Sequence, residues 1–244
     1  MTVDQTTGHR RTAATARSIL SCPADVQLVV DGIEDISDGI EPDHPGAVPV
    51  LRMQDVDGRP GFSCPATAAL ALAAHEGRSA LLTVASGLGA PGSPDRGEVL
   101  TIAGPLRADL EECACCSEVR TLVTVHAEMV VLDREDRPES RRRVPLAAFN
   151  APDLHLNRGF LQRSMEHANE CHQEELRHAV ATSAAVPAGR IAGVGLSGLA
   201  PDRVEVHWVD HSGAHRRELR FPRTATTTTE LGELLREELH AGLC

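Results

Sequence analysis

Aromatic side chains are scarce in this sequence. They make up 2% of the 244 residues, with no Tyr and a single Trp. A flavin, a porphyrin or a nucleic-acid base would find few rings to stack against, so its contacts must be mostly aliphatic. The sequence also contains no Walker A loop, no GxSxG elbow and no HExxH pair, and no two carboxylates stand out as acid and base. Hydrolase and kinase chemistry therefore have no support.

Long apolar runs and an excess of positive charge are missing as well. No 18-residue apolar stretch occurs, and the first 20 residues lack the apolar segment of a secretory signal. The formal net charge of −11 argues against a binder of phosphate backbones. The seven cysteines, with Cys113, Cys115 and Cys116 crowded together, do not have the spacing of a disulfide framework. We therefore expect a cytoplasmic protein with neither a membrane nor a nucleic-acid partner.

The first half of the chain alternates short apolar segments with turns that contain Gly and Pro. Such segments are typical of β-strands, and the Ala- or Leu-rich stretches between them favour helices. Strands are expected at residues 26–30, 47–53, 60–63, 79–85, 98–107, 129–132 and 144–149, and helices at 10–20, 65–76 and 110–125. Short strands at close spacing with a few helices predict an antiparallel β-barrel with helical decoration over residues 12–150.

The second half of the chain has a different order of expected elements. One long helix is expected over residues 158–182, followed by strands at 190–197, 203–210 and 215–221 and a last helix at 226–239. The stretch Asp210-His-Ser-Gly213 has the composition of a hairpin turn. These elements form a small α-β-β-β-α domain over residues 154–240, with a boundary near 151–153. The whole chain is thus predicted to be α+β.

The expected long helix concentrates side chains that bind metals or protons. Its apolar face is formed by Leu161, Met165, Ala168, His172, Leu176 and Ala179. A second line at helical spacing is formed by His167, Cys171, Glu174 and His178. One straight helix presents only two such ligands to one ion, so a solvated polar face is the default interpretation of the second line. His172 is either a core histidine with satisfied ring nitrogens or a ligand.

The spacing His167-x-Asn169-x-x-His172 resembles the HxNxxH signature that opens the C-terminal domain of HugZ-like haem-utilisation proteins. The ending 217–223 before an acidic amphipathic helix is similar to the end of that domain, and residues 63–84 are similar to part of the barrel before it. The resemblance implies a split β-barrel of the pyridoxamine-phosphate-oxidase group followed by the HxNxxH domain. It also implies haem binding, a homodimer through the barrel, and a role in haem breakdown, haem handling or tetrapyrrole regulation.

If haem binds, the resemblance directs its iron to the long helix. His172 is preferred over His167 as the ligand, because an apolar face favours the neutral imidazole. The two residues lie about 140° apart around a continuous helix, so they do not both face one iron. The second axial position is filled by His215 or His211 of the hairpin, or stays open. Arg143, at the end of an arginine run, is a candidate partner of the haem propionates.

These assignments have simpler alternatives. The hairpin histidines, with His207 on one strand face beside Glu205, are commonly turn and surface residues, and an arginine run is commonly a solvated turn. The leading hypothesis is haem storage, delivery or sensing, with haem degradation next. The alternatives are a flavin-dependent oxidase or reductase and a regulatory module that binds a tetrapyrrole-pathway enzyme. We expect no tightly bound FMN, because no phosphate-binding set of residues is recognisable.

Overall fold

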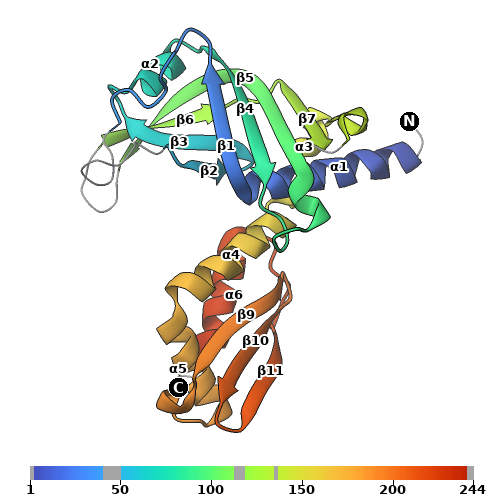
Figure 1. Ribbon diagram of the computed structural model, residues 1–244, viewed down its shortest axis with the longest axis vertical. Helices are drawn as coiled ribbons and strands as arrows, with labels where there is room; N and C mark the ends of the chain where they lie inside the picture. Colours follow the sequence, from blue (N-terminus) through green and yellow to red (C-terminus); the bar gives the residue numbers. More distant parts are fainter. Residues whose placement is uncertain (1–2, 41–50, 113–118, 135–136, 241–244) are drawn as a thin grey trace. The chain divides into compact units, whose positions relative to one another are not determined.

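The computed structural model describes residues 3–40, 51–112, 119–134 and 137–240. The chain separates into two compact units, Met1–Leu154 and His155–Cys244, and the division falls next to the expected boundary. The first unit contains a strongly curled antiparallel sheet, and the second contains a small three-stranded sheet (Figure 1). The predicted α+β class is confirmed. Within the described ranges, no helix is both long and apolar enough to cross a lipid bilayer.

The first unit is built on a sheet whose strands pair antiparallel throughout the described residues. Its strands are β1 (Pro23–Val30), β2 (Met53–Val56), β3 (Arg59–Pro65), β4 (Ser79–Ser86), β5 (Glu98–Glu112), β6 (Val119–Val125), β7 (Met129–Arg134) and β8 (Arg142–Arg143). Neighbours follow the order β1-β4-β5-β6-β3-β2, and β7 pairs with both β5 and β8. Its helices are α1 (Val3–Ser21), α2 (Ala69–His75) and α3 (Leu146–Phe149), with 3-10 turns η1 (Pro94–Gly97), η2 (Pro138–Ser140) and η3 (Pro152–Leu154).

Strand β5 exchanges partners along its length. Its first part pairs with β4 and β7, and its last part, from Leu106 onward, pairs with β6. Just before this exchange, a Cβ atom on Gly104 would come within 1.9 Å of the carbonyl oxygen of His126. A residue without a side chain is required at this close approach. Gly104 therefore lets one strand serve two parts of the curled sheet.

The inner face of the curled sheet is apolar because side chains alternate along each strand. In β4, for example, Leu82 and Val84 are fully buried, whereas Leu81 between β1 and β5 is exposed. The core of the unit is formed by Ala13, Ala16, Ile19 and Leu20 of α1 together with Leu82, Val84, Leu100, Ile102, Val130 and Leu132 of the sheet. Helix α1 thus closes the curl with small and branched aliphatic side chains.

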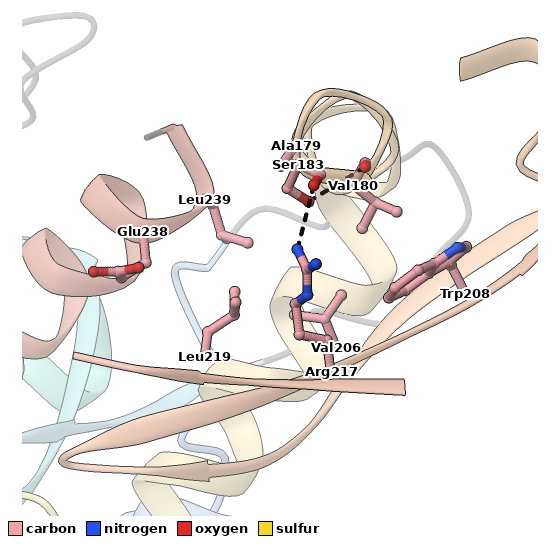
Figure 2. Close-up of a pocket in the computed structure, with 9 residues that line it drawn as sticks. All are labelled: Ala179, Val180, Ser183, Val206, Trp208, Arg217, Leu219, Glu238 and Leu239. Carbon is pink, nitrogen blue, oxygen red and sulfur yellow. Dashed lines mark hydrogen bonds between the residues drawn. The ribbon is translucent and has the colours of Figure 1, made fainter. Parts of the chain in front are cut away.

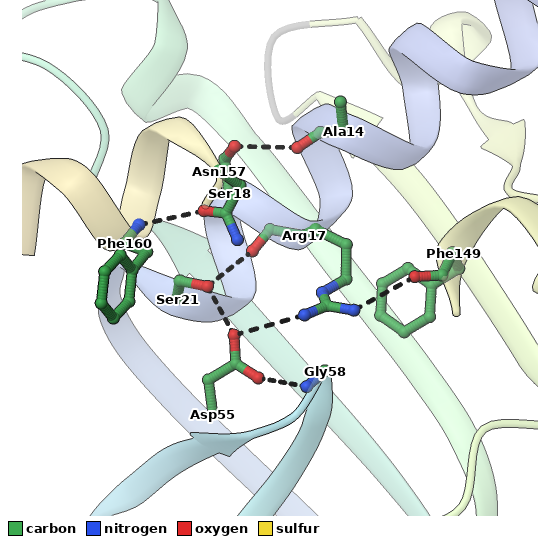
Figure 3. Close-up of polar contacts among 9 residues, drawn as sticks. All are labelled: Ala14, Arg17, Ser18, Ser21, Asp55, Gly58, Phe149, Asn157 and Phe160. Atoms are coloured by element: carbon green, nitrogen blue, oxygen red, sulfur yellow. Dashed lines mark hydrogen bonds and ion pairs between the residues drawn. The ribbon is translucent and has the colours of Figure 1, made fainter. Parts of the chain in front are cut away.

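Among the described residues of this unit, Arg17 of α1 is a charged side chain that is fully buried. Its Nη1 donates to the carbonyl oxygen of Phe149 at 3.3 Å, and its Nη2 lies 4.0 Å from the carboxylate of Asp55 (Figure 3). Asp55 also accepts hydrogen bonds from the hydroxyl of Ser21 and the N–H of Gly58. Burial lowers the pKa of Arg17, and the charge of Asp55 opposes that shift. The cluster joins α1 to the β2–β3 turn and to the end of α3.

Two expected elements of the first unit are wrong. Within the range 110–125, the described residues are the end of β5, up to Glu112, and β6, Val119–Val125, and they are not helical. Three Val and two Thr favour a strand in β6, and its pairing with β3 and β5 on its two sides outweighs the local helix preference. Residues 144–149 contain α3 in place of a strand, because Pro145 is well suited to a helix start.

Other expectations for the first unit fall partly outside the described residues. The strand expected at 47–53 is described only from residue 51, and β2 begins at Met53. Cys113, Cys115 and Cys116 also lie outside the described residues. The helix expected at 65–76 is shorter, because α2 begins at Ala69, four residues after Pro65 ends β3.

The second unit places its helices on one face of a three-stranded antiparallel sheet. Its elements are α4 (Arg158–Cys171), α5 (Gln173–Ala184), η4 (Ala188–Arg190), β9 (Gly193–Ala200), β10 (Arg203–Asp210), β11 (Gly213–Arg220) and α6 (Thr228–His240). The strand order is β11-β10-β9, and Asp210 pairs with Gly213 at the expected hairpin turn. The core between helices and sheet is formed by Leu176 and Val180 of α5, Leu196, Val204 and Val206 of the sheet, and Leu231 and Leu234 of α6.

Candidate functional site

The candidate site is built around an interruption of the expected long helix. Helix α4 ends at Cys171 and α5 begins at Gln173, and His172 between them has φ −120° and ψ 32°. The expectation of one continuous helix over residues 158–182 is therefore wrong. Neither Pro nor Gly lies at the break, so the usual backbone causes do not apply. The cause is found in side chains that bond to the sheet.

Asn169 and Gln173 attach the two helices to the edge of the sheet. Asn169 accepts a hydrogen bond from the N–H of Leu196 at 2.7 Å and donates one to the carbonyl oxygen of the same residue at 3.0 Å. Gln173 donates to the carbonyl oxygens of Val194 at 3.1 Å and of Asn169 at 2.7 Å. Both side chains satisfy backbone groups of β9 that a neighbouring strand would otherwise satisfy. The central Asn of the HxNxxH spacing thus has a structural role.

The break brings His167 and His172 together. Their ring centroids lie 5.1 Å apart with the ring planes at 82°, which is an edge-to-face contact. The expected separation of about 140° is wrong because it assumed an unbroken helix. The placement of His172 on the buried face is also wrong, since its side chain is 48% exposed. Ala168, Leu176 and Ala179 form that buried face without it.

A carboxylate orients the ring of His172. Its Nδ1 lies 3.4 Å from Oε1 of Glu175, one helical turn further along. The pKa of Glu175 is lowered first by its own backbone N–H and then by hydrogen bonding to His172. A carboxylate that contacts one ring nitrogen helps to fix the orientation of the ring. The contact engages Nδ1 and leaves Nε2 as the second ring nitrogen of an exposed imidazole.

This arrangement offers too few protein ligands for a bare metal ion. In the part of the chain that the structure describes, no three His, Cys, Asp or Glu side chains are grouped to hold an ion. Along the second line of the expected helix, Glu174 forms an ion pair with Arg177, and Cys171 is a free, exposed thiol. Because structural and catalytic zinc sites use three or four protein ligands, the two imidazoles alone are too few.

The apolar cavity of the second unit lies elsewhere and is small. It is lined mainly by Val180, Val206, Leu219 and Leu239, between α5, the sheet and α6 (Figure 2). Its volume of about 30 Å³ corresponds to roughly one water molecule, whereas drug-sized ligand sites have about 300–1,000 Å³. The expectation that His172 borders an apolar pocket for a porphyrin against the sheet is therefore wrong.

The hairpin histidines are not part of the His167–His172 pair. His215 stacks on Trp208 with ring centroids 4.9 Å apart, and its Nε2 lies 3.0 Å from the buried carboxylate of Asp210. Hydrogen bonds from Ser212 first and from His215 second lower the pKa of Asp210 strongly. His215 lies on β11, two strands from β9, which is roughly 10 Å at the usual strand spacing. His211 is an exposed residue of the turn.

A third histidine and carboxylate meet on the outer face of the same sheet. His207 Nε2 lies 2.8 Å from Glu205 Oε1, and the Ser197 hydroxyl contacts both. Hydrogen bonds from Ser197 first and from Arg216 after it lower the pKa of Glu205. Serine and carboxylate both approach the same ring nitrogen, whereas a catalytic triad needs them on opposite nitrogens. The group is therefore a closed polar network and is not an activated nucleophile.

Of the five predicted binding residues, His167 and His172 are brought together. His215 and His211 lie at the hairpin, and Arg143 is exposed on β8 in the first unit. The sequence analysis missed the orienting role of Glu175, although its spacing of three residues from His172 would have revealed it. The bonds of Asn169 and Gln173 to β9 carried no sequence signal, because they depend on a strand more than 20 residues further along.

Two solved structures are similar to the chain over most of its length. One is a heme binding protein from Mycobacterium smegmatis, at 12% identity, with 95% of this chain and 97% of that chain covered and a TM-score of 0.38. The other is the protein Atu2129 of unknown function from Agrobacterium tumefaciens str. C58, at 17% identity, with 93% and 94% covered and a TM-score of 0.35. No family model and no curated protein matches. Likenesses at these TM-scores and identities support no inference about function.

Proposed function

We propose that the chain binds haem at the helix break, with His172 Nε2 as the iron ligand and His167 beside it, and that it delivers or senses haem. The observation that supports this proposal is the contact between two exposed imidazoles, one of them oriented by Glu175. Haem brings four nitrogen ligands of its own. One or two protein ligands therefore suffice for its iron, whereas they do not suffice for a bare ion.

The two imidazoles have different roles in this proposal. Rings in edge-to-face contact leave no space between them for a porphyrin plane, whose van der Waals thickness is about 3.5 Å. His167 and His172 thus do not bind opposite faces of one haem. His172 binds the iron, and His167 lies beside the ring, where it can donate to a propionate. The sixth position stays open to water, to a small ligand or to a partner protein.

Delivery or sensing suits an exposed site better than degradation does. A haem on the surface leaves without the opening of a closed pocket, which favours transfer to a partner. Oxidative breakdown needs a site that excludes water and protects reactive intermediates. His172 is 48% exposed, and the unit's apolar cavity of about 30 Å³ admits no porphyrin. Haem degradation therefore ranks second.

Titration of the full chain with haemin tests this proposal. We expect a shifted Soret band at one haemin per chain, which is lost in His172→Ala and altered in His167→Ala. His178→Ala is the matched control, because His178 is an exposed histidine of the neighbouring helix α5. The affinity of this variant for haemin should stay within about twofold of the wild-type value. An unchanged Soret band in both His172→Ala and His167→Ala would exclude the helix break as the site. The same spectra would reveal stoichiometric flavin, the outcome that favours the flavin-dependent alternative.

We also infer that a second copy of the chain covers the outer face of the curled sheet. Val29, Leu81, Ala103 and Met129 are direct cross-strand neighbours on β1, β4, β5 and β7. Val29, Leu81 and Met129 are 63%, 44% and 39% exposed, and such a continuous apolar row is typical of an interface. A homodimer through this row agrees with the oligomer that the family resemblance implies.

Sedimentation of variants tests the dimer. Leu81→Glu places a charge at the centre of the row, so we expect it to convert a dimer into a monomer. Leu72→Glu is the matched control, because Leu72 is a leucine on α2 that is 53% exposed and lies outside the row, so the change should leave the dimer intact. A wild-type chain that sediments as a monomer at micromolar concentration would contradict the inference.

A further inference from the structure

A second cavity lies in the first unit, where α1 passes α3. Its volume of about 260 Å³ is several times larger than that of the apolar cavity lined by Val180 and Val206 in the second unit. One wall is formed by Ala147, Ala148 and Ala151, whose side chains are too small to fill the space. The pocket is open to solvent, because Thr6, His9, Arg10, Ala147 and Asp153 are exposed, whereas Leu154 is buried. An open, mostly apolar pocket of this kind can admit a small ligand.

The opposite wall is one face of helix α1. Thr6, His9 and Arg10 lie at spacings of three and four residues, so they project from the same side of the helix. An apolar cavity with a few convergent polar groups at its rim is the usual form of a small-molecule site.

The charged residues that line the cavity are Arg10 and Asp153, and Arg10 is the group that can hold an anion. Arg10 forms an ion pair with Asp153, and both side chains are exposed. Exposed ion pairs contribute little to stability, so a ligand carboxylate can take the place of Asp153 at low cost. Arg also matches the planar geometry of a carboxylate with two parallel hydrogen bonds.

We propose that this cavity binds a monocarboxylate with a compact apolar body, held by Arg10 with Thr6 and His9 and covered by the alanine wall. A volume of about 260 Å³ equals roughly nine water-sized groups at about 30 Å³ each, which matches an acid of about eight carbons. The site does not depend on haem, because it is formed entirely within the first unit. It also differs from the helix break in ligand class, since it accepts a chain and not a wide ring.

Calorimetric titration of the full chain with octanoate tests the proposal. We expect one site per chain with a dissociation constant on the order of 0.1–1 mM, as suits a ligand of this size. Octanol, which lacks the charge, and octylamine, which reverses it, should each bind at least about tenfold more weakly. Equal binding of octanoate and octylamine, or no octanoate binding at about 10 mM, would overturn the proposal.

Three variants locate the site. Arg10→Gln should weaken octanoate binding by about tenfold or more, whereas Arg11→Gln removes the same charge from a residue that does not line the cavity and should change it by less than about twofold. Ala148→Leu should abolish binding by filling the cavity. If circular dichroism shows that Ala148→Leu does not fold, Thr6→Leu fills the space from the helix side. Equal losses in Arg10→Gln and Arg11→Gln would show a general charge effect and refute the site.

Discussion

Among the described residues, the first unit buries Arg17 and the second buries Asp210, but their contacts differ in reach: those of Asp210 stay within one hairpin. In the first unit, Arg17 is buried, and its contacts join a helix, a turn and a second helix. In the second unit, the polar contacts lie at the sheet edge and the hairpin, and they leave imidazoles of His167 and His172 exposed. A buried charge with several partners stabilises an architecture, whereas an exposed imidazole with one oriented nitrogen is available to a ligand. The contrast supports a structural role for the Arg17 cluster and agrees with the haem site that we propose at the helix break.

The largest effect on stability is expected from Asp55→Ala, which removes a carboxylate from the buried Arg17 cluster. The change leaves the guanidinium of Arg17 buried without its counter-charge and also removes the acceptor of Ser21 and Gly58. We expect the free energy of unfolding of the first unit to fall by about 3 kcal/mol. Urea unfolding followed by far-ultraviolet circular dichroism measures the change.

An exposed pair in the second unit provides the control for Asp55→Ala. Arg163 and Glu166 form an ion pair at 3.1 Å on the surface of α4. Arg163→Gln should lower the free energy of unfolding by less than about 0.5 kcal/mol. If the two variants lose similar amounts, the buried cluster does not stabilise the first unit in the way we describe.

A middle-sized effect is expected from Asn169→Ala, which tests the sheet edge. The N–H and carbonyl of Leu196 would both lose their partner, which costs about 1–3 kcal/mol where the groups stay buried. Without this anchor the helix should also straighten, and His167 and His172 should separate. Histidine ring resonances in NMR spectra report the separation directly.

Glu170→Ala is the matched control for Asn169→Ala, because Glu170 is the next residue and is exposed. It should leave both the stability and the histidine resonances nearly unchanged. Retention of the histidine contact in Asn169→Ala would mean that Gln173 alone maintains the break. That result would transfer the anchoring role to the hydrogen bond with Val194.

The smallest effect is expected at Glu230, in the first turn of α6. Its carboxylate accepts hydrogen bonds from the N–H and hydroxyl of Thr226 and pairs with Arg223, and these partners, Thr226 first, lower its pKa to about 2. A carboxyl with a lowered pKa stabilises the fold above its ordinary value near 4.3, and this contribution is lost as the pH falls towards 2. Glu230→Gln should therefore lower Tm slightly at pH 7.

The pH dependence of Glu230→Gln separates this effect from a general loss of helix stability. Near pH 2 the wild-type carboxyl becomes protonated, so the Tm difference between the two proteins should vanish. Thermal unfolding at pH 7, 4 and 2 measures it. A Tm difference that stays constant over this range would show that the charge of Glu230 is not the cause.

Local patterns predicted the hairpin of the second unit well. The β10 strand spans the expected residues 203–210, and its turn pairs Asp210 with Gly213, because alternation and turn composition are both encoded within a few residues. The helix expected at 110–125 was wrong for the opposite reason. Val119–Val125 form a strand through pairing with β3, some 60 residues earlier, and with the last part of β5. Such distant pairing is not visible in a local window.

The candidate site shows the same limit. The residue types and their spacing identified His167, Asn169 and His172, but the geometry between them depended on the edge of β9. A helix without Pro or Gly gives no local reason to end at Cys171. The exposure of His172 followed from that break. Hence the residues of the site could be predicted, whereas their arrangement could not.

The stacking of Trp208 on His215 also has a consequence for spectroscopy. Trp208 is the single Trp in a chain without Tyr, and it belongs to the second unit. Fluorescence excited in the indole band therefore originates from the second unit alone, and the first unit is silent in that signal. Far-ultraviolet circular dichroism, in contrast, records the helices and strands of both units. Following one denaturation by both signals therefore distinguishes the unfolding of the two units without a label or a truncated chain.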